Sequence, residues 1–159
     1  MPILYYTSVF FHVVSAAFWV GGMLFLPLVM LPGIKNNPDK VSILYSTGLK
    51  FRFYGWFAMA ILVITGILNM YLRGIPLTLQ ALTENTYGIL VTYKLFLFAG
   101  IIAVSGFHDI MMGKKTIEEM QKNTNTNSKL IARWSGRMML LLSLAMVYIG
   151  IILSRGGAI

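Results

Sequence analysis

The residues best suited to chemistry in this 159-residue chain are two histidines and one lysine that lie inside apolar stretches. His12 lies in "FFHVVSAAFWVGG", Lys94 in "TYKLFLFAG" and His108 in "AVSGFHDIMM". Imidazole nitrogens bind iron, copper and zinc, and a neutral lysine nitrogen can bind iron. The chain has no cysteine, which excludes disulfides, thiolate metal sites and cysteine nucleophiles.

Four apolar stretches must position these side chains. The chain is 57% hydrophobic and 11% charged, which is not the composition of a soluble domain. A bilayer core needs roughly 20 apolar residues per helix. The predicted helices cover about residues 3–31, 53–72, 87–112 and 136–154. We therefore expect an all-α fold, an integral membrane four-helix bundle that forms a single domain over residues 1–159.

The basic residues are distributed unevenly over the predicted connections. Ten of them lie in or beside the first and third connections: Lys35, Lys40, Lys50, Arg52, Lys114, Lys115, Lys122, Lys129, Arg133 and Arg137. The second connection and the C-terminal tail hold only Arg73 and Arg155. The positive-inside rule then predicts that both termini lie on the external side, in the periplasm, with the chain in a bacterial inner membrane. The basic residues are expected to contact lipid headgroups or, for Arg52 and Arg137, to pair with Asp109, and nucleic-acid binding is not expected.

The depth of each polar residue follows from the helical rise. His12 lies about 7 Å and Lys94 about 9 Å to the external side of the helix centres, at 1.5 Å per residue. His108 lies about 12 Å to the internal side. His12 and Lys94 therefore lie at the same depth. The depths of His12 and His108 differ too much for both histidines to bind one haem iron.

The level of His12 is the first candidate site. His12 and Lys94 could bind a haem iron, with Asn69 and Tyr148 as neighbours from the second and fourth helices. Nearby turns of the first helix contribute further candidate wall residues: Ser15, Ala16 and Trp19. Two simpler interpretations stay open, because an intramembrane histidine can hydrogen-bond across a bundle and a lysine can extend to the interface.

The level of His108 is the second candidate site. His108 and Met112 are four residues apart and share a helix face, and Met111, Met138 and Met139 lie at a similar depth. Imidazole and thioether ligands suit monovalent copper. Methionines in an apolar chain are also packing residues. The sequence therefore predicts haem at the first site and offers copper as the alternative at the second.

Several motifs resemble those of two related membrane families. "FHVVSAAFWVGGMLFLPLVMLP" is similar to the first helix of the copper-resistance D (CopD) domain and of the HemJ-type protoporphyrinogen oxidases. The shared pattern is a histidine, a tryptophan, a small-residue pair and a Leu-Pro step: His12, Trp19, Gly21, Gly22 and Leu26-Pro27. "LKFRFYGWFAMAILVITGILN" and "TYGILVTYKLFLFAGIIAVSGFHD" resemble their second and third helices.

The resemblance implies a different function for each branch. The HemJ-type branch implies a b-type haem held by His12 and Lys94, and oxidation of protoporphyrinogen. The CopD branch implies copper handling at the inner membrane. Two departures weaken the oxidase assignment: Leu28 stands where an arginine is expected, and "RWSGRMM" replaces an Asn-Glu pair before the last helix.

The leading hypothesis from sequence is thus a b-type haem membrane protein in electron transfer or oxidation of a hydrophobic substrate. It leaves the reaction open, and it would make the protein a haem-dependent oxidoreductase with a quinone or a porphyrinogen as partner. The alternatives are a copper-handling or copper-transport protein and a cofactor-free membrane subunit. A homodimer is compatible with so small a bundle but does not follow from the sequence.

Overall fold

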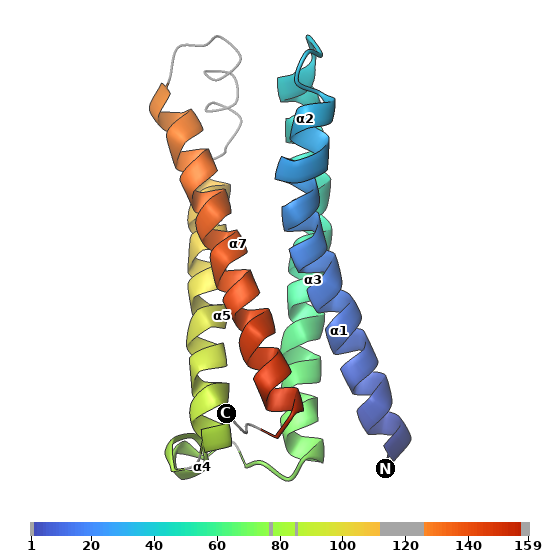
Figure 1. Cartoon of the computed structure of the whole chain (residues 1–159), viewed down its shortest axis with the longest axis vertical. Helices are drawn as coiled ribbons and strands as arrows, with labels where there is room; N and C mark the ends of the chain where they lie inside the picture. Colours follow the sequence, from blue (N-terminus) through green and yellow to red (C-terminus); the bar gives the residue numbers. More distant parts are fainter. Residues whose placement is uncertain (1, 77, 85, 112–125, 157–159) are drawn as a thin grey trace.

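The computed structural model describes all residues except 1, 77, 85, 112–125 and 157–159. Within this part of the chain the fold consists of long antiparallel helices and a few short ones, without strands (Figure 1). The long helices are α1 (Pro2–Phe25), α3 (Lys40–Leu72), α5 (Thr86–Met111) and α7 (Thr126–Ser154). All four are apolar and long enough to cross a membrane, which confirms the predicted fold class.

The two ends of the bundle differ in what they contain. The start of α1 and the end of α7 lie at one end of the bundle, where the short helix α4 (Leu79–Thr83) also lies (Figure 1). We call this the terminal end. The opposite end, where α1 leads into α3 and where α7 begins, is called the basic end because most lysines and arginines are near it in the sequence.

The first helix continues past a proline by changing its hydrogen bonding. Pro27 has no backbone N–H, so it cannot bond to the carbonyl four residues earlier. The chain forms the π-helix η1 (Leu26–Met30), in which the Leu31 N–H donates to the Leu26 carbonyl five residues back. The short helix α2 (Leu31–Gly33) follows, so the apolar stretch predicted for residues 3–31 forms one continuous rod.

Two helices begin earlier than predicted. α3 starts at Lys40 instead of near residue 53, and α7 starts at Thr126 instead of near residue 136. The added turns contain polar and charged residues, which hydropathy assigns to connections although a helix can extend beyond the hydrocarbon. Of the connection expected between residues 112 and 136, residues 113–125 lie outside the described part and residues 126–135 are helical.

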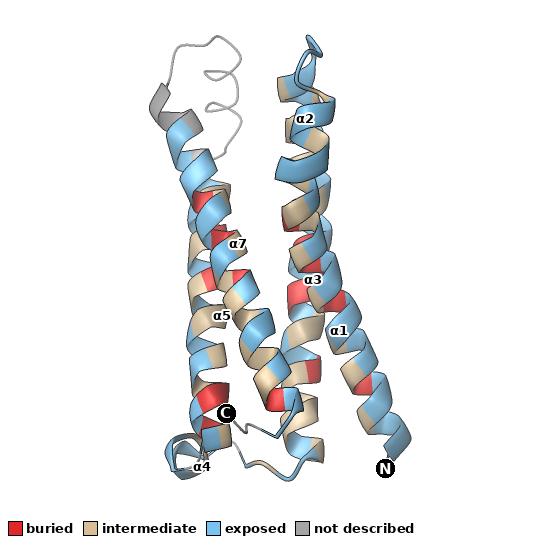
Figure 2. Cartoon of the chain, in the orientation of Figure 1, coloured by how far each residue is buried: buried red, intermediate tan, exposed pale blue. Residues whose placement is uncertain are grey.

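The bundle is made of two hairpins. α1 packs along α3 and α5 along α7, and the hairpins meet mainly where α1 approaches α7. At Gly22 of α1 the Phe51 ring of α3 occupies the space that a Cβ atom would need. Only 17–28% of the residues in each spanning window are buried. Figure 2 shows these residues as a narrow stripe between helices, so most apolar side chains face outward, as expected in a lipid bilayer.

The buried residues form two clusters. The larger, which we call the central cluster, contains Trp19, Met23, Met59, Ile101 and Met139 and joins all four helices. The smaller lies nearer the terminal end and contains Leu90, Val91 and Leu153.

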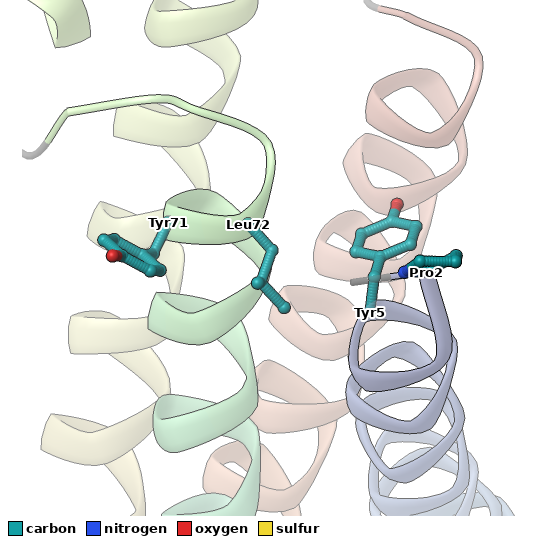
Figure 3. Close-up of a pocket in the computed structure, with 4 residues that line it drawn as sticks. All are labelled: Pro2, Tyr5, Tyr71 and Leu72. Carbon is teal, nitrogen blue, oxygen red and sulfur yellow. The ribbon is translucent and has the colours of Figure 1, made fainter.

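A single arginine connects the four helices at the terminal end. Arg73, directly after α3, donates to the Tyr5 hydroxyl through Nε and to the Tyr87 hydroxyl through a terminal nitrogen, both at 2.8 Å. The latter nitrogen also lies 3.4 Å from the Leu153 carbonyl oxygen of α7. Burial lowers the pKa of Arg73, but the interactions with Tyr5 and Tyr87 raise it by more. The pKa of Arg73 is therefore above its usual value. Beside this arginine, Tyr5 and Leu72 line an open pocket together with Pro2 and Tyr71 (Figure 3).

Candidate functional site

His12 is held by a hydroxyl group of the neighbouring helix in its own hairpin. The half-buried imidazole extends from α1 towards α3, where His12 Nδ1 lies 2.8 Å from Thr65 Oγ1. The Thr65 hydroxyl donates to the Ile61 carbonyl oxygen at 2.6 Å, one turn earlier in α3. Because a hydroxyl has one proton, Nδ1–H of His12 is the donor in the contact with Thr65. The neutral ring then has its lone pair on Nε2, which can bind a metal.

Lys94 lies in the same half of the bundle as His12. Its half-buried side chain leaves α5 and reaches α7, where Nζ would lie 3.7 Å from a Cβ atom placed at Gly150. Within the described residues Lys94 has no hydrogen bond or ion pair. His12 packs towards α3 and Lys94 towards α7, so a direct contact between these two side chains stays a prediction.

Asn69 adds an unsatisfied polar atom to α3, one turn beyond Thr65. Its Oδ1 is buried and has no hydrogen-bond partner among the described residues. Buried amide oxygens are normally paired, so this atom marks a place where a partner is missing. Ser8 of α1 is buried nearby, with its hydroxyl 3.4 Å from the Thr65 carbonyl oxygen.

The remaining residues predicted around His12 are dispersed. Ser15 is buried and Ala16 half-buried on α1. Trp19 belongs to the central cluster, where Nε1 donates to Ser143 Oγ at 3.0 Å and the ring stacks on Phe51. Tyr148 is 67% exposed, so its ring lies on the outer surface of α7 and not with His12.

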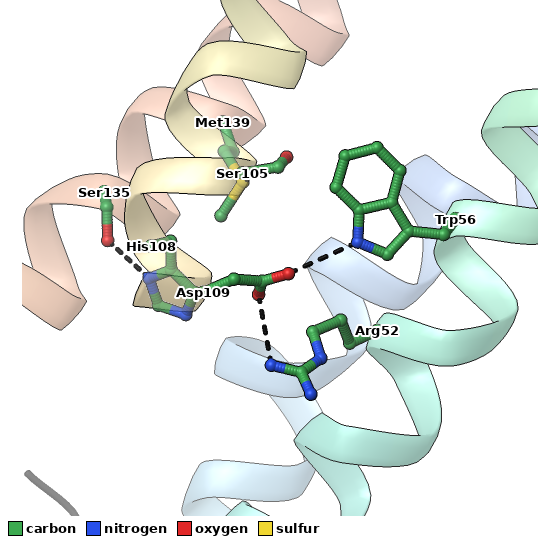
Figure 4. A network of polar contacts seen from close by, with 7 residues as sticks. All are labelled: Arg52, Trp56, Ser105, His108, Asp109, Ser135 and Met139. Atoms are coloured by element: carbon green, nitrogen blue, oxygen red, sulfur yellow. Dashed lines mark hydrogen bonds and ion pairs between the residues drawn. The ribbon is translucent and has the colours of Figure 1, made fainter. Parts of the chain in front are cut away.

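His108 repeats the arrangement of His12 in the other hairpin. Its half-buried ring extends from α5 towards α7, where Nδ1 lies 2.7 Å from Ser135 Oγ (Figure 4). The Ser135 hydroxyl donates to the Ile131 carbonyl oxygen, again one turn earlier in the partner helix. The same reasoning assigns the Nδ1 proton to His108 and the free lone pair to Nε2.

The surroundings of His108 are charged. The adjacent Asp109 turns towards α3, where Oδ2 accepts from Trp56 Nε1 at 3.2 Å and Oδ1 lies 3.8 Å from an Arg52 nitrogen (Figure 4). The predicted pairing of Arg52 with Asp109 is confirmed. Arg137 instead lies over the ring of Trp134.

Methionines near His108 differ in orientation. Met112 lies outside the described residues, so the predicted pair of His108 and Met112 is not described by the structure. Met138 is 51% exposed, whereas Met139 is buried and its sulfur lies 3.2 Å from Ser105 Oγ. Ser105 precedes His108 by three residues and Met139 follows Ser135 by four, so both lie one turn from the imidazole towards the bundle centre (Figure 4).

The two histidines belong to separate sites. Lys94 and His108 are fourteen residues apart on α5, which corresponds to about 21 Å. No group of three or more histidine, cysteine, aspartate or glutamate side chains comes together in the described part of the chain.

Sequence reasoning missed the residues that hold the histidines. Thr65 and Ser135 are single hydroxyl residues within apolar helices, and only the packing of two helices identifies which imidazole each one meets. Met23 and Met59 were also missed, since nothing in the sequence distinguishes a methionine that faces the bundle centre from one that faces lipid.

Comparison with known proteins assigns the family. The family model described as "Copper resistance protein D" matches residues 47–154. The chain belongs to the copper resistance protein D (CopD) family. No solved structure matches it.

Three relatives illustrate the range of the match. An uncharacterized protein of Aquifex aeolicus (strain VF5) is 34% identical over 92% of this chain and 93% of its own length. The copper transport protein CutJ of Bacillus subtilis (strain 168) is 27% identical over 79% of this chain but only 21% of its own length. Copper resistance protein D of Pseudomonas syringae pv. tomato is 24% identical over 89% of this chain and 44% of its own.

These findings favour the copper alternative over the leading haem hypothesis. No comparison supports the HemJ-type branch, and two of the three relatives are named for copper. The His12 ring lies against Gly66 of α3 and Lys94 Nζ against Gly150 of α7, so each side chain is packed onto a neighbouring helix.

Proposed function

We propose that this protein handles copper in a bacterial inner membrane, binding Cu(I) inside the bundle and passing it between the two histidine sites. Membership of the CopD family supports the choice of metal. The uneven distribution of basic residues supports an orientation with both termini in the periplasm.

One observation carries the proposal. Each histidine is fixed through Nδ1 by a hydroxyl group that is itself bonded to a helix carbonyl. Holding one ring nitrogen by a hydrogen bond orients the other, which is how outer-shell partners position metal-binding imidazoles. His12 and His108 would each contribute Nε2, in different halves of the membrane.

The direct test is Cu(I) binding by the purified protein in mild detergent. Affinity is measured anaerobically by competition with the chelator bicinchoninate. We expect the wild type to withdraw Cu(I) from the chelator, and His12→Ala and His108→Ala each to weaken or remove one binding event. Tyr148→Phe, on the outer surface, is the matched control and should behave as wild type. A wild-type protein that withdraws no Cu(I) contradicts the proposal.

The same preparation tests the haem hypothesis. A visible spectrum is recorded with and without dithionite, after expression with added haem. We expect no Soret band. A band that disappears in His12→Ala and remains in His108→Ala would replace copper with haem at the first site.

A further inference from the structure

The centre of the bundle contains three buried methionines from three different helices. Met23 of α1, Met59 of α3 and Met139 of α7 belong to the central cluster, with exposed fractions of 8%, 3% and 8%. They make up three of the five buried members of that cluster. Methionine packs well in irregular cores, but it also brings a polarizable thioether sulfur, so the cluster gathers three soft metal ligands.

Two of the sulfur atoms are oriented by serine hydroxyls. Ser105 of α5 donates to Met139 Sδ at 3.2 Å, and Ser143 of α7 lies 3.9 Å from Met23 Sδ. Ser143 also accepts from Trp19 Nε1, which fixes its own position. A thioether sulfur has two lone pairs, so one remains for a metal after the hydrogen bond is made.

The two sulfurs lie at neighbouring levels of the bundle. Met139 and Ser143 are four residues apart on α7, so they share a face and are separated by about 6 Å along the axis. Met23 is at the level of Ser143, and Met59 completes the same buried cluster from α3.

This cluster lies between the two histidine sites. On α7, Ser135 holds His108, Met139 follows one turn later, and Gly150 is beside Lys94. A cation that moves from one imidazole to the other must cross about 20 Å of apolar interior. Neutral, soft sulfur ligands are the groups that accept Cu(I) there without adding a buried charge.

We infer that Met23, Met59 and Met139 form a Cu(I) site of thioether ligands at the centre of the membrane. The inference rests on the proposed function and adds to it a third site, through which the ion moves between His12 and His108. Binding releases no proton and needs no redox partner, because the ion stays monovalent and the ligands stay neutral.

The absence of cysteine makes the test unambiguous, because any sulfur bound to copper must come from methionine. Full-length protein is labelled with selenomethionine, loaded with Cu(I) from its bicinchoninate complex, and studied by X-ray absorption at the copper edge. We expect selenium scatterers in the copper shell of the labelled protein, at full occupancy of the sites.

Single substitutions then identify the methionines. Met23→Leu, Met59→Leu and Met139→Leu should each remove one selenium scatterer and weaken the binding of this ion by more than the roughly 10- to 100-fold that loss of an outer-shell partner causes. Leucine conserves volume, so we expect these variants to fold, which circular dichroism and gel filtration check. Met138→Leu is the matched control, since the neighbouring side chain faces outward.

The outcomes separate the two proposals. Copper bound only by nitrogen and oxygen overturns the thioether site and leaves the copper function intact. A number of selenium scatterers that stays undiminished in all three variants also overturns it, because other methionines would then be the ligands. A labelled protein that binds no Cu(I) overturns both.

Discussion

The sites of His12 and His108 share one support geometry but differ in electrostatic surroundings. Each imidazole meets a hydroxyl of its partner helix within a hairpin. Lys94 adds a basic side chain to the half of the bundle that contains His12, whereas Asp109 adjoins His108 and pairs with Arg52. Like charges repel strongly in a medium of low dielectric constant. The charge of Lys94 therefore disfavours the binding of a cation at His12. At His108 the Asp109 carboxylate attracts a cation, and Arg52 offsets part of that attraction.

This contrast shows how the same hydroxyl support can give two metal sites of different affinity. The hydroxyl support prepares Nε2 for a metal in both halves, and the neighbouring charges set how tightly the metal is held. We expect the stronger Cu(I) site near the basic end and the weaker one near the terminal end.

The largest effect is expected from removal of the ligand at the stronger site. His108→Ala should weaken the tighter binding event by more than about 100-fold, because a direct ligand is lost instead of a supporting partner. His12→Ala should leave that event unchanged and abolish the weaker one. Titration with Cu(I) against two chelators of different affinity measures both events. Equal losses in the two variants would contradict the ordering of the sites.

The second effect concerns the hydroxyl supports. Thr65→Val keeps the shape of the side chain and removes the group that orients His12, so the weaker binding event should lose about 10- to 100-fold in affinity. Thr65→Ser should restore it. Ser135→Ala should act in the same way on the tighter event alone. If Thr65→Val and wild type bind Cu(I) alike, the hydroxyl has no orienting role.

The third effect comes from the lysine. Lys94→Met removes the positive charge near His12 and should tighten Cu(I) binding there about tenfold, which is about 1.4 kcal/mol. Lys94→Arg retains the charge and should leave the affinity near that of wild type. Competition titrations of the three proteins compare them directly. Weaker binding in Lys94→Met would instead make the lysine a ligand.

The smallest effect is expected for the ion pair at the basic end. Asp109→Asn removes the attraction to Arg52, whose side chain is 44% exposed, so the cost in unfolding free energy should be only about 0–1 kcal/mol. Asparagine can still accept from Trp56. Thermal unfolding in detergent measures the stability, and Cu(I) affinity near His108 should fall modestly in the same variant. A loss of several kcal/mol would show that Asp109 has a larger structural role.

The fold could be predicted from sequence because it depends on one-dimensional information. Apolar runs long enough for a bilayer gave all four helices, and the rise per residue placed Lys94 with His12 and away from His108. The helix starts at Lys40 and Thr126 could not be predicted in this way, because polar turns beyond the hydrocarbon carry no apolar signal.

The site could be predicted only in part because it depends on how helices rotate against one another. Tyr148 was expected beside His12 but faces outward. Thr65, Ser135 and Met23 face inward, and their roles depend on a side chain from a different helix. These residues alone also could not distinguish a haem site from a copper site, because an imidazole binds both haem iron and copper.

Arg73 has a consequence for how the protein is made. Its guanidinium bonds to a tyrosine of the first helix, a tyrosine of the third spanning helix and a carbonyl near the chain's end. During synthesis these partners emerge in order, so the full set of bonds cannot form until the last helix has been inserted. The arginine therefore joins the four long helices described at this end only after α7 is in place.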